Sequence, residues 1–423
     1  MAGHHTIDIM KENRHLGSLA GKVLAPAAVI GLACLGVAVA MGLGGDKEVK
    51  SRFFQGYLVA VVFGTGISLG ALFFTLIHHL TRAGWSTVVR RIAELLACCS
   101  LLMAVLWLPL IWALRSPDIH LWDWATTMAD DPLVKHKAGY LNETFFLIRA
   151  AIYFIIWIVL SQFFYRLSVR QDETGDVNLS RKMQKVAAPG IILFALTLTF
   201  AAFDWLMSQD PHWFSTIFGV YYFAGSVCSF VALAILISAF LQRSGRLTHA
   251  ITTEHYHDLG KLLFAFGVVF WAYIAFSQYM LQWYGNIPEE TLWWQPRASG
   301  YTGTVVYHGH EITPGAWNNW SLFLLVGHFV GPFLAIISRM PKRNRVMLVA
   351  AAAWMLAMSW YDLFWLVMPV FHADHPGIVL TDVLCGAGVL AMVVAFAAAM
   401  ARSVSLVPQR DPRLGESLAF ENA

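Results

Sequence analysis

Residues 186–206, VAAPGIILFALTLTFAAFDWL, form an apolar run of about the 20 residues that an α-helix needs to cross the hydrocarbon core of a bilayer. The only charged side chain in this run is Asp204. A carboxylate at membrane depth costs about 2.5–3.5 kcal/mol even on lenient insertion scales, so it normally has a partner and a function. A second apolar run, residues 357–369, carries Asp362. Proton or ion handling is therefore the first functional hypothesis. The alternative is that each acid only joins two helices.

The composition as a whole is that of an integral membrane protein. Of the 423 residues, 58% are hydrophobic and only 13% are charged, against about 25% charged residues in soluble proteins. Apolar runs of membrane-spanning length predict ten transmembrane helices. The predicted spans are residues 23–43, 53–76, 91–114, 144–167, 186–206, 214–241, 258–284, 317–338, 345–371 and 378–402.

The basic residues predict the orientation of these spans. Most of the 29 Lys and Arg residues fall in the two tails and in the loops on the same side as the tails. By the positive-inside rule, both termini are cytoplasmic. The net charge of +3 is explained by this topology and gives no reason to expect a nucleic-acid partner. The first span is too long for the apolar core of a signal peptide, so we expect it to be retained as a membrane anchor.

A sparse internal repeat predicts how the spans are grouped. Gly64 and Arg82 recur at one fixed offset as Gly225 and Arg243, and the aromatic-Asp pair at 203–204 recurs at 361–362. Because each copy contains four spans, both copies run in the same direction through the bilayer. The expected fold is an all-α integral membrane protein with two parallel-repeat four-helix bundles and two peripheral helices. The predicted units are a cytoplasmic tail (1–22), peripheral helix 1 (23–43), the first bundle (53–206), the second bundle (214–371), peripheral helix 10 (378–402) and a second cytoplasmic tail (403–423).

Buried polar residues fall into an outer and an inner group when they are sorted by depth at 1.5 Å per residue. Such half-paths, separated by an apolar centre, are what proton transfer across part of a membrane requires. For the inner residues, the alternative is a side chain that extends to the cytoplasmic surface. The outer candidates are Arg149, Asp204, Asp362 and Asp382; His328 lies near the middle; the inner candidates are His78, His79, Glu94, Asp258 and Lys261.

The sequence predicts no redox cofactor or metal bound within this chain. All five cysteines lie in predicted spans without a C-x-x-C pattern, which argues against iron-sulfur, c-type haem and structural zinc sites. A bis-histidine haem needs two imidazoles at one depth, and His328 has no counterpart at its level. The short motifs at 255–258 and 308–311 could contact a metal, although solvated loop histidines are the commoner explanation.

Four segments carry a resemblance to a known family. They are residues 203–208 (FDWLMS), 210–219 (DPHWFSTIFG), 257–266 (HDLGKLLFAF) and 270–280 (FWAYIAFSQYM). With them, the chain resembles the ActF membrane subunits of bacterial alternative complex III, which belong with the NrfD-like quinol-interacting membrane proteins. The likeness extends over most of the chain, from the second predicted span to the ninth.

The resemblance implies a subunit of a respiratory quinol:electron-acceptor oxidoreductase in the bacterial inner membrane. The partners implied are a sister NrfD-like membrane subunit and iron-sulfur and c-haem subunits on the periplasmic side, which pass electrons to cytochrome c or to a terminal oxidase. Quinol oxidation releases two protons, so carboxylates and histidines near the outer face have a use as proton acceptors and relays.

The family's quinol pocket lies near the outer face of the first bundle and uses histidine and aspartate. Here the third and fourth spans contain no histidine, so we expect proton handling and scaffolding, with quinol oxidised mainly in the sister subunit. If quinone binds to this chain, the candidate residues are Arg149, Asp204, Asp210 and His212. Two alternatives remain: a structural anchor for the redox subunits without a proton path, and a secondary transporter, which would show broken helices in matching places.

Overall fold

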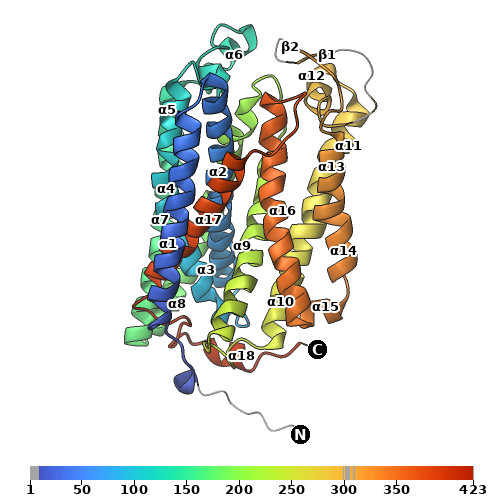
Figure 1. Ribbon diagram of the computed structural model, residues 1–423. Coiled ribbons are helices and arrows are strands. Elements are labelled where there is room, and N and C mark those ends of the chain that lie inside the picture. The colour runs from blue at the N-terminus through green and yellow to red at the C-terminus, as the bar shows by residue number, and fades with distance from the viewer. Residues whose placement is uncertain (1–8, 299, 301–304, 308–309, 423) are drawn as a thin grey trace.

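The computed structural model describes residues 9–298, 300, 305–307 and 310–422. In this part of the chain, nine helices are long and apolar enough to cross a membrane, and a bent helix pair makes ten if it is counted as one span. The long helices run side by side along one common direction (Figure 1). The predicted class of an all-α, multi-pass membrane protein is therefore confirmed.

The first half of the chain forms five spans. They are α1 (Leu19–Leu43), α2 (Lys47–Leu80), the broken span α3 (Thr87–Ala97), α4 (Ser100–Trp107) and α5 (Pro109–Arg115), α7 (Glu143–Thr174) and α8 (Val177–Trp205). Helix α2 begins six residues before the predicted span at 53, because Asp46 caps it by accepting a hydrogen bond from the Val49 backbone N–H at 3.0 Å. The chain bends by 42° between Trp107 and Pro109, where proline cannot donate a backbone hydrogen bond to the preceding turn.

The second half forms five more spans, two of which contain π-helical turns. They are α9 (Phe218–Arg243), α10 (Thr253–Leu262) continued by the π-helix η4 (Leu263–Phe270) and α11 (Trp271–Gly285), α13 (Asn318–Leu324) continued by the π-helix η6 (Leu325–Val330) and α14 (Gly331–Ile336), α16 (Arg345–Phe371) and α17 (Leu380–Met400). The hydrophobic pattern could not distinguish π from α turns, because both present apolar side chains to the lipid.

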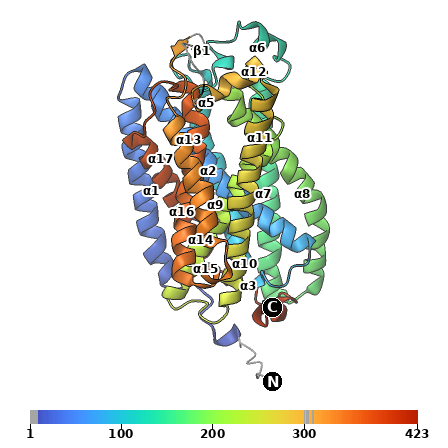
Figure 2. The same ribbon diagram turned by 90° about the vertical axis from the view of Figure 1, so that its right-hand side faces the viewer.

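Short elements close the two ends of the bundle. They are η1 (Ile9–Lys11), η2 (Asp123–Ala125), α6 (Pro132–His136), η3 (Met207–Gln209), α12 (Pro288–Thr291), η5 (Leu292–Trp294), the antiparallel strands β1 (Val305–Tyr307) and β2 (His310–Ile312), α15 (Arg339–Arg343) and α18 (Leu414–Leu418). Elements α6, α12, β1 and β2 lie at one end, which we call the loop end, and α18 lies at the opposite end, which we call the tail end (Figures 1 and 2). The predicted topology makes the loop end periplasmic and the tail end cytoplasmic.

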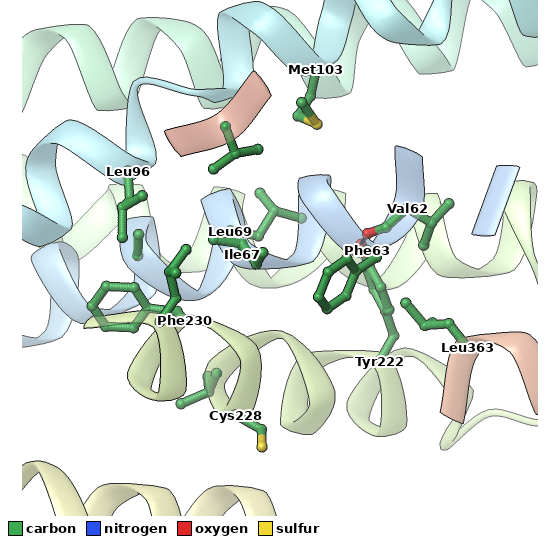
Figure 3. Packing of buried hydrophobic residues seen from close by; sticks show 14 of the residues in the cluster. Val62, Phe63, Ile67, Leu69, Leu96, Met103, Tyr222, Cys228, Phe230 and Leu363 are labelled. Atoms are coloured by element: carbon green, nitrogen blue, oxygen red, sulfur yellow. Dashed lines mark hydrogen bonds between the residues drawn. The ribbon is translucent and has the colours of Figure 1, made fainter. Parts of the chain in front are cut away.

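Helix α2 is the centre of the packing. Of its most apolar window, 89% is buried, compared with 17% for α1. It contacts α9, α17, α3 and α8, whereas α1 packs mainly on α17. Gly66 and Gly70 of α2 allow close contact with α9: a Cβ atom added at Gly70 would lie 2.2 Å from the Ser226 carbonyl oxygen. Figure 3 shows apolar side chains of α2 such as Phe63, Ile67 and Leu69 against residues of α9 and α3.

Candidate functional site

Asp362 of α16 is the centre of a buried polar cluster in the second half of the chain. The carboxylate is 2% exposed. The Tyr221 hydroxyl of α9 donates a hydrogen bond to one oxygen, and the indole N–H of Trp271 donates to the other at 3.0 Å. Asp362 forms no ion pair within the described ranges. Both donors are thus uncharged, and this carboxyl group has no counter-ion beside it.

A cavity of about 10 Å³ adjoins this cluster between α2, α9 and α16. Its polar lining comes from Asp362, Tyr221, Ser226, Ser229 and Ser359. The three serines donate to backbone carbonyls at 2.8–2.9 Å, which leaves their oxygen atoms able to accept. About 10–15 Å³ is the space that one buried water needs. The cavity can therefore hold one water in contact with the Asp362 carboxyl group.

His328 lies on the other side of Trp271. The imidazole and indole rings are stacked, with centroids 4.0 Å apart and planes 2° apart. His328 is fully buried, and neither ring nitrogen has a hydrogen-bond partner among the described residues. The residue lies in η6, and Trp271 directly follows η4. π-Helical turns are frequent at functional sites, so both features make the surroundings of Trp271 a candidate site.

A much larger cavity, of about 800 Å³, opens beside the same two aromatic residues. It lies between α11 on one side and α13, η6 and α14 on the other, and Trp293, Trp294, Arg297 and Ala298 line it at the loop end. Tyr221 and Trp271, the two donors to Asp362, both line it. A volume of 300–1,000 Å³ with a mainly apolar lining and a few polar groups is typical of a small-molecule site.

Asp204, the other predicted acid, is placed very differently. Arg149 of α7 donates to both of its carboxylate oxygens at 2.8 Å, and the Tyr153 hydroxyl donates to one of them at 2.7 Å. The guanidinium group also donates to the Tyr140 carbonyl and lies 3.8 Å above the Tyr140 ring centroid. The pair is buried, and its charges neutralise each other.

The remaining outer candidates do not assemble into one site. Asp382 pairs with Arg52, an arginine that the sequence reading did not select, at 2.5 Å. Asp210 accepts a hydrogen bond from Tyr307 at 3.1 Å, and His212 lies 3.2 Å from a carboxylate oxygen of Asp131. None of the four predicted quinone-site residues lines the 800 Å³ cavity, whose walls come from the second half of the chain.

At the tail end, the structure separates the inner candidates. Glu94 is fully buried, with one oxygen 2.9 Å from Arg91 and the other 3.5 Å from Arg90. His78 and His79 are 7% and 2% exposed, so the alternative of side chains extending to the surface is wrong for these three residues. Phe164 packs on His79, and Phe74 and Trp85 pack on His78. The C-terminal segment holds the two arginines beside Glu94: Asp411 pairs with Arg90, and the Ser405 carbonyl accepts from Arg91.

Asp258 and Lys261 pair with each other on α10, and the Lys261 side chain is 46% exposed. His255 contacts the Thr252 and Ser417 hydroxyls. Within the described ranges, no group of three metal-binding side chains occurs. Residues 308 and 309 of the second predicted metal motif lie outside the described residues.

Comparison with protein-family models and with curated proteins found no match.

Sequence reasoning selected Asp362 and His328 but missed Tyr221 and Trp271, which join them. Buried tyrosines and tryptophans are common in membrane spans, and nothing in their spacing distinguished these two. Arg297, which lines the large cavity, was overlooked because it lies in a loop. Arg90 and Arg91 were overlooked because basic residues next to a span normally reach the membrane surface.

Proposed function

We propose that this chain is a membrane subunit of a bacterial respiratory quinol:electron-acceptor oxidoreductase, of the alternative complex III type, and that it moves protons coupled to quinol oxidation. The support is the resemblance carried by residues 203–219 and 257–280, together with the multi-pass helical fold. In this proposal, the spans form two parallel-repeat four-helix bundles with two peripheral helices. Both termini are in the cytoplasm, and the loop end faces the periplasm.

The observation that carries the proton role is the contrast between the two acids. Proton uptake by Asp204 would break two ionic hydrogen bonds and leave Arg149 as a buried, unpaired cation. Proton uptake by Asp362 leaves no cation behind, because its donors are the neutral side chains of Tyr221 and Trp271. Asp362 is therefore the proposed proton carrier, and Asp204 is the proposed helix tether.

Tyr221 supplies the connection that a proton carrier needs. It lines both the large cavity and the one-water cavity, and a hydroxyl group can accept one proton while it donates another. The proposed route runs between the large cavity and Asp362 through the Tyr221 hydroxyl, and continues to the serine-lined cavity. At the tail end, the buried groups His79 and Glu94 form a second polar region, separated from the first by apolar residues of α2 and α9 (Figure 3).

The partners in this proposal are those that the resemblance implies. They are a sister NrfD-like membrane subunit, periplasmic iron-sulfur and c-haem subunits, and a terminal oxidase. The second candidate function is a structural anchor for the redox subunits. It is favoured by the ion pairs that neutralise most buried charges, such as Arg149 with Asp204 and Arg52 with Asp382.

One experiment separates these functions. The chain is purified from its native membrane with its neighbours and reconstituted in vesicles, and quinol oxidation and pH change are recorded together. We expect haem and iron-sulfur proteins to copurify. We expect Asp362→Asn to assemble normally and to slow proton movement by roughly a hundredfold, the lower range for loss of a general acid or base.

Asp204→Asn is the control, because it removes a second buried aspartate that the proposed proton route does not use. Unaltered proton stoichiometry in Asp362→Asn would leave the structural anchor as the function. Isolation of the chain alone, with solute uptake in vesicles, would instead identify a secondary transporter.

A further inference from the structure

The 800 Å³ cavity changes in character along its length. At the loop end it is lined by polar side chains, including Arg297, Gln278 and Ser321. Towards the tail end its lining is apolar, with Leu325, Phe329 and Phe333. An occupant that matches both parts has a polar head at the loop end and an apolar chain that runs towards the middle of the bundle.

Arg297 determines which kind of polar head can bind at the loop end of the cavity. The side chain is fully buried, and its guanidinium group lies 3.6 Å above the Trp293 ring centroid. Its two terminal nitrogens donate to the carbonyls of Trp293 and Leu366 at 2.6 and 3.0 Å, but Nε has no partner among the described residues. A buried donor without an acceptor is costly and uncommon. An oxygen atom of the occupant would satisfy it.

The charge of Arg297 persists although the residue is buried. Burial lowers its pKa to about 10, which is still well above neutral pH. The Tyr307 hydroxyl and the nearby Asp210 act in the opposite direction and favour the charged form of Arg297. The loop end of the cavity is therefore a cationic hydrogen-bond donor that favours an oxygen with partial negative charge.

Gln278 supplies a second donor on the facing helix α11. Its carbonyl oxygen accepts from the Ser215 hydroxyl at 3.3 Å, which leaves its amide nitrogen as a donor. Aromatic side chains, among them Trp293, Trp365 and Trp271, form much of the wall around these two donors. Two donors and aromatic walls match a flat ring with two oxygens, because flat rings stack on aromatic faces.

We infer that this cavity binds a quinone or quinol, with the ring oxygens at Arg297 and Gln278 and the alkyl tail along Phe329 and Phe333. The inference rests on the proposed function and deepens it, because it assigns the quinol-class ligand to the second half of this chain. Tyr221 and Trp271 then lie between the ligand and Asp362. A phospholipid is the other occupant with a polar head and an apolar chain, and the experiment below distinguishes it from a quinone.

The test measures binding of a decyl-substituted benzoquinone to the full chain in nanodiscs by equilibrium dialysis. Ala275 lines the cavity on α11, so Ala275→Phe places a phenyl ring inside it and obstructs an occupant. Ala265 is an exposed residue of η4 that does not line the cavity, so Ala265→Phe is the matched control. We expect wild type and the control to bind equally, and Ala275→Phe to bind at least about tenfold more weakly.

Gln278→Leu serves as a second variant in case the added phenyl ring disturbs folding. Loss of one donor is expected to weaken binding about fivefold, which corresponds to about 1 kcal/mol for one hydrogen bond. Equal binding by all four proteins overturns the inference. So does native mass spectrometry that shows a retained phospholipid which the quinone does not displace.

The reconstituted complex distinguishes this failure from failure of the proposed function. If the Ala275→Phe complex oxidises quinol at the wild-type rate while Asp362→Asn stops proton movement, the site is wrong and the proposed function stands. If the chain binds quinone in an Ala275-dependent manner but copurifies with no redox subunit, the site stands and the proposed function is wrong.

Discussion

Arg149 donates two parallel hydrogen bonds to Asp204, one from Nε to Oδ2 and one from Nη2 to Oδ1, each at 2.8 Å. Both side chains are buried, so this bidentate pair connects α7 to α8 where water cannot replace either partner. Removal of one partner of a buried ion pair typically costs about 3–5 kcal/mol, because it strands the other charge. We expect Arg149→Gln to lower the yield of folded protein and the thermal midpoint of unfolding in detergent.

We expect Asp204→Asn to lower the thermal midpoint less than Arg149→Gln does. The stranded arginine keeps its hydrogen bond to the Tyr140 carbonyl and its position above the Tyr140 and Phe145 rings. The double variant should be more stable than Arg149→Gln alone, since it removes the stranded carboxylate. A double variant no more stable than Arg149→Gln would show that the arginine acts through packing and not through its charge.

We expect His372 to make the loop end sensitive to acid. It follows the last residue of α16 and contacts the Gln55 side-chain oxygen at 2.8 Å. Burial, followed by the nearby positive charge of Arg52, lowers its pKa to about 4 from the ordinary value of 6.5. The unfolded state therefore binds more protons between pH 6.5 and 4. The resulting stability is fully present above pH 6.5 and is lost as pH falls through this range.

At pH 4, the free energy of unfolding is lower by about 3 kcal/mol at most because of this one group. We expect the thermal midpoint of the wild type to fall more steeply between pH 7 and 4.5 than that of His372→Gln, which keeps a donor but cannot titrate. If the thermal midpoints of the two proteins fall equally as the pH is lowered, His372 is not a source of acid sensitivity.

The C-terminal segment should depend on one ion pair for its position. Asp411 pairs with Arg90, which is fully buried, and its other oxygen accepts from the Arg413 backbone N–H at 2.8 Å. Asp411→Asn leaves Arg90 with only the Glu94 contact at 3.5 Å. We expect trypsin to cleave the segment after Arg402 and Arg410 severalfold faster than in the wild type.

Glu416→Gln is the control for this experiment, because Glu416 is exposed in the same segment and forms no ion pair within the described ranges. Equal cleavage of Asp411→Asn and Glu416→Gln would mean that apolar packing alone, through residues such as Leu414, holds the segment.

The spans could be predicted from the sequence because bilayer thickness fixes the length of an apolar helix. The interruptions in them could not. Nothing in residues 263–270 or 325–330 distinguishes a π turn from an α turn, since the choice depends on how neighbouring helices pack. The bend before Pro109 has a local cause that a sequence can reveal.

For the site, the position of each residue along its predicted span placed Arg149 and Asp204 at the same depth in the membrane, and the structure pairs them. Depth alone could not show which of Asp204 and Asp362 is better suited to carry a proton, because the difference lies in their hydrogen-bond partners. The partners of Asp362 are aromatic residues, 141 and 91 positions away in the chain. The large cavity is also a product of tertiary packing, formed where α11 and α13 diverge around side chains that no local pattern relates.

The absence of a resident redox cofactor stays a prediction. It follows from five cysteines without a C-x-x-C spacing and from a mid-membrane histidine without a matching one. The purified subunit, separated from its neighbours, should give no pyridine haemochrome spectrum and less than stoichiometric iron. A haem signal in that preparation would contradict the prediction, whereas bound quinone would not.

The orientation of the bundle can be tested with single cysteines at its two ends. Glu289 in α12 is exposed at the loop end, and Ser403, just after α17, is exposed at the tail end. The background is the protein with Cys34 replaced by alanine, because the other four cysteines are buried. An impermeant maleimide added to intact cells should label Glu289→Cys at once and Ser403→Cys only after permeabilisation. Both positions are judged against the same unlabelled background.

The opposite labelling pattern would place the loop end in the cytoplasm. Asp362 and the large cavity would then face the wrong side to serve periplasmic redox subunits, and the proposed function would have to be abandoned together with the positive-inside assignment.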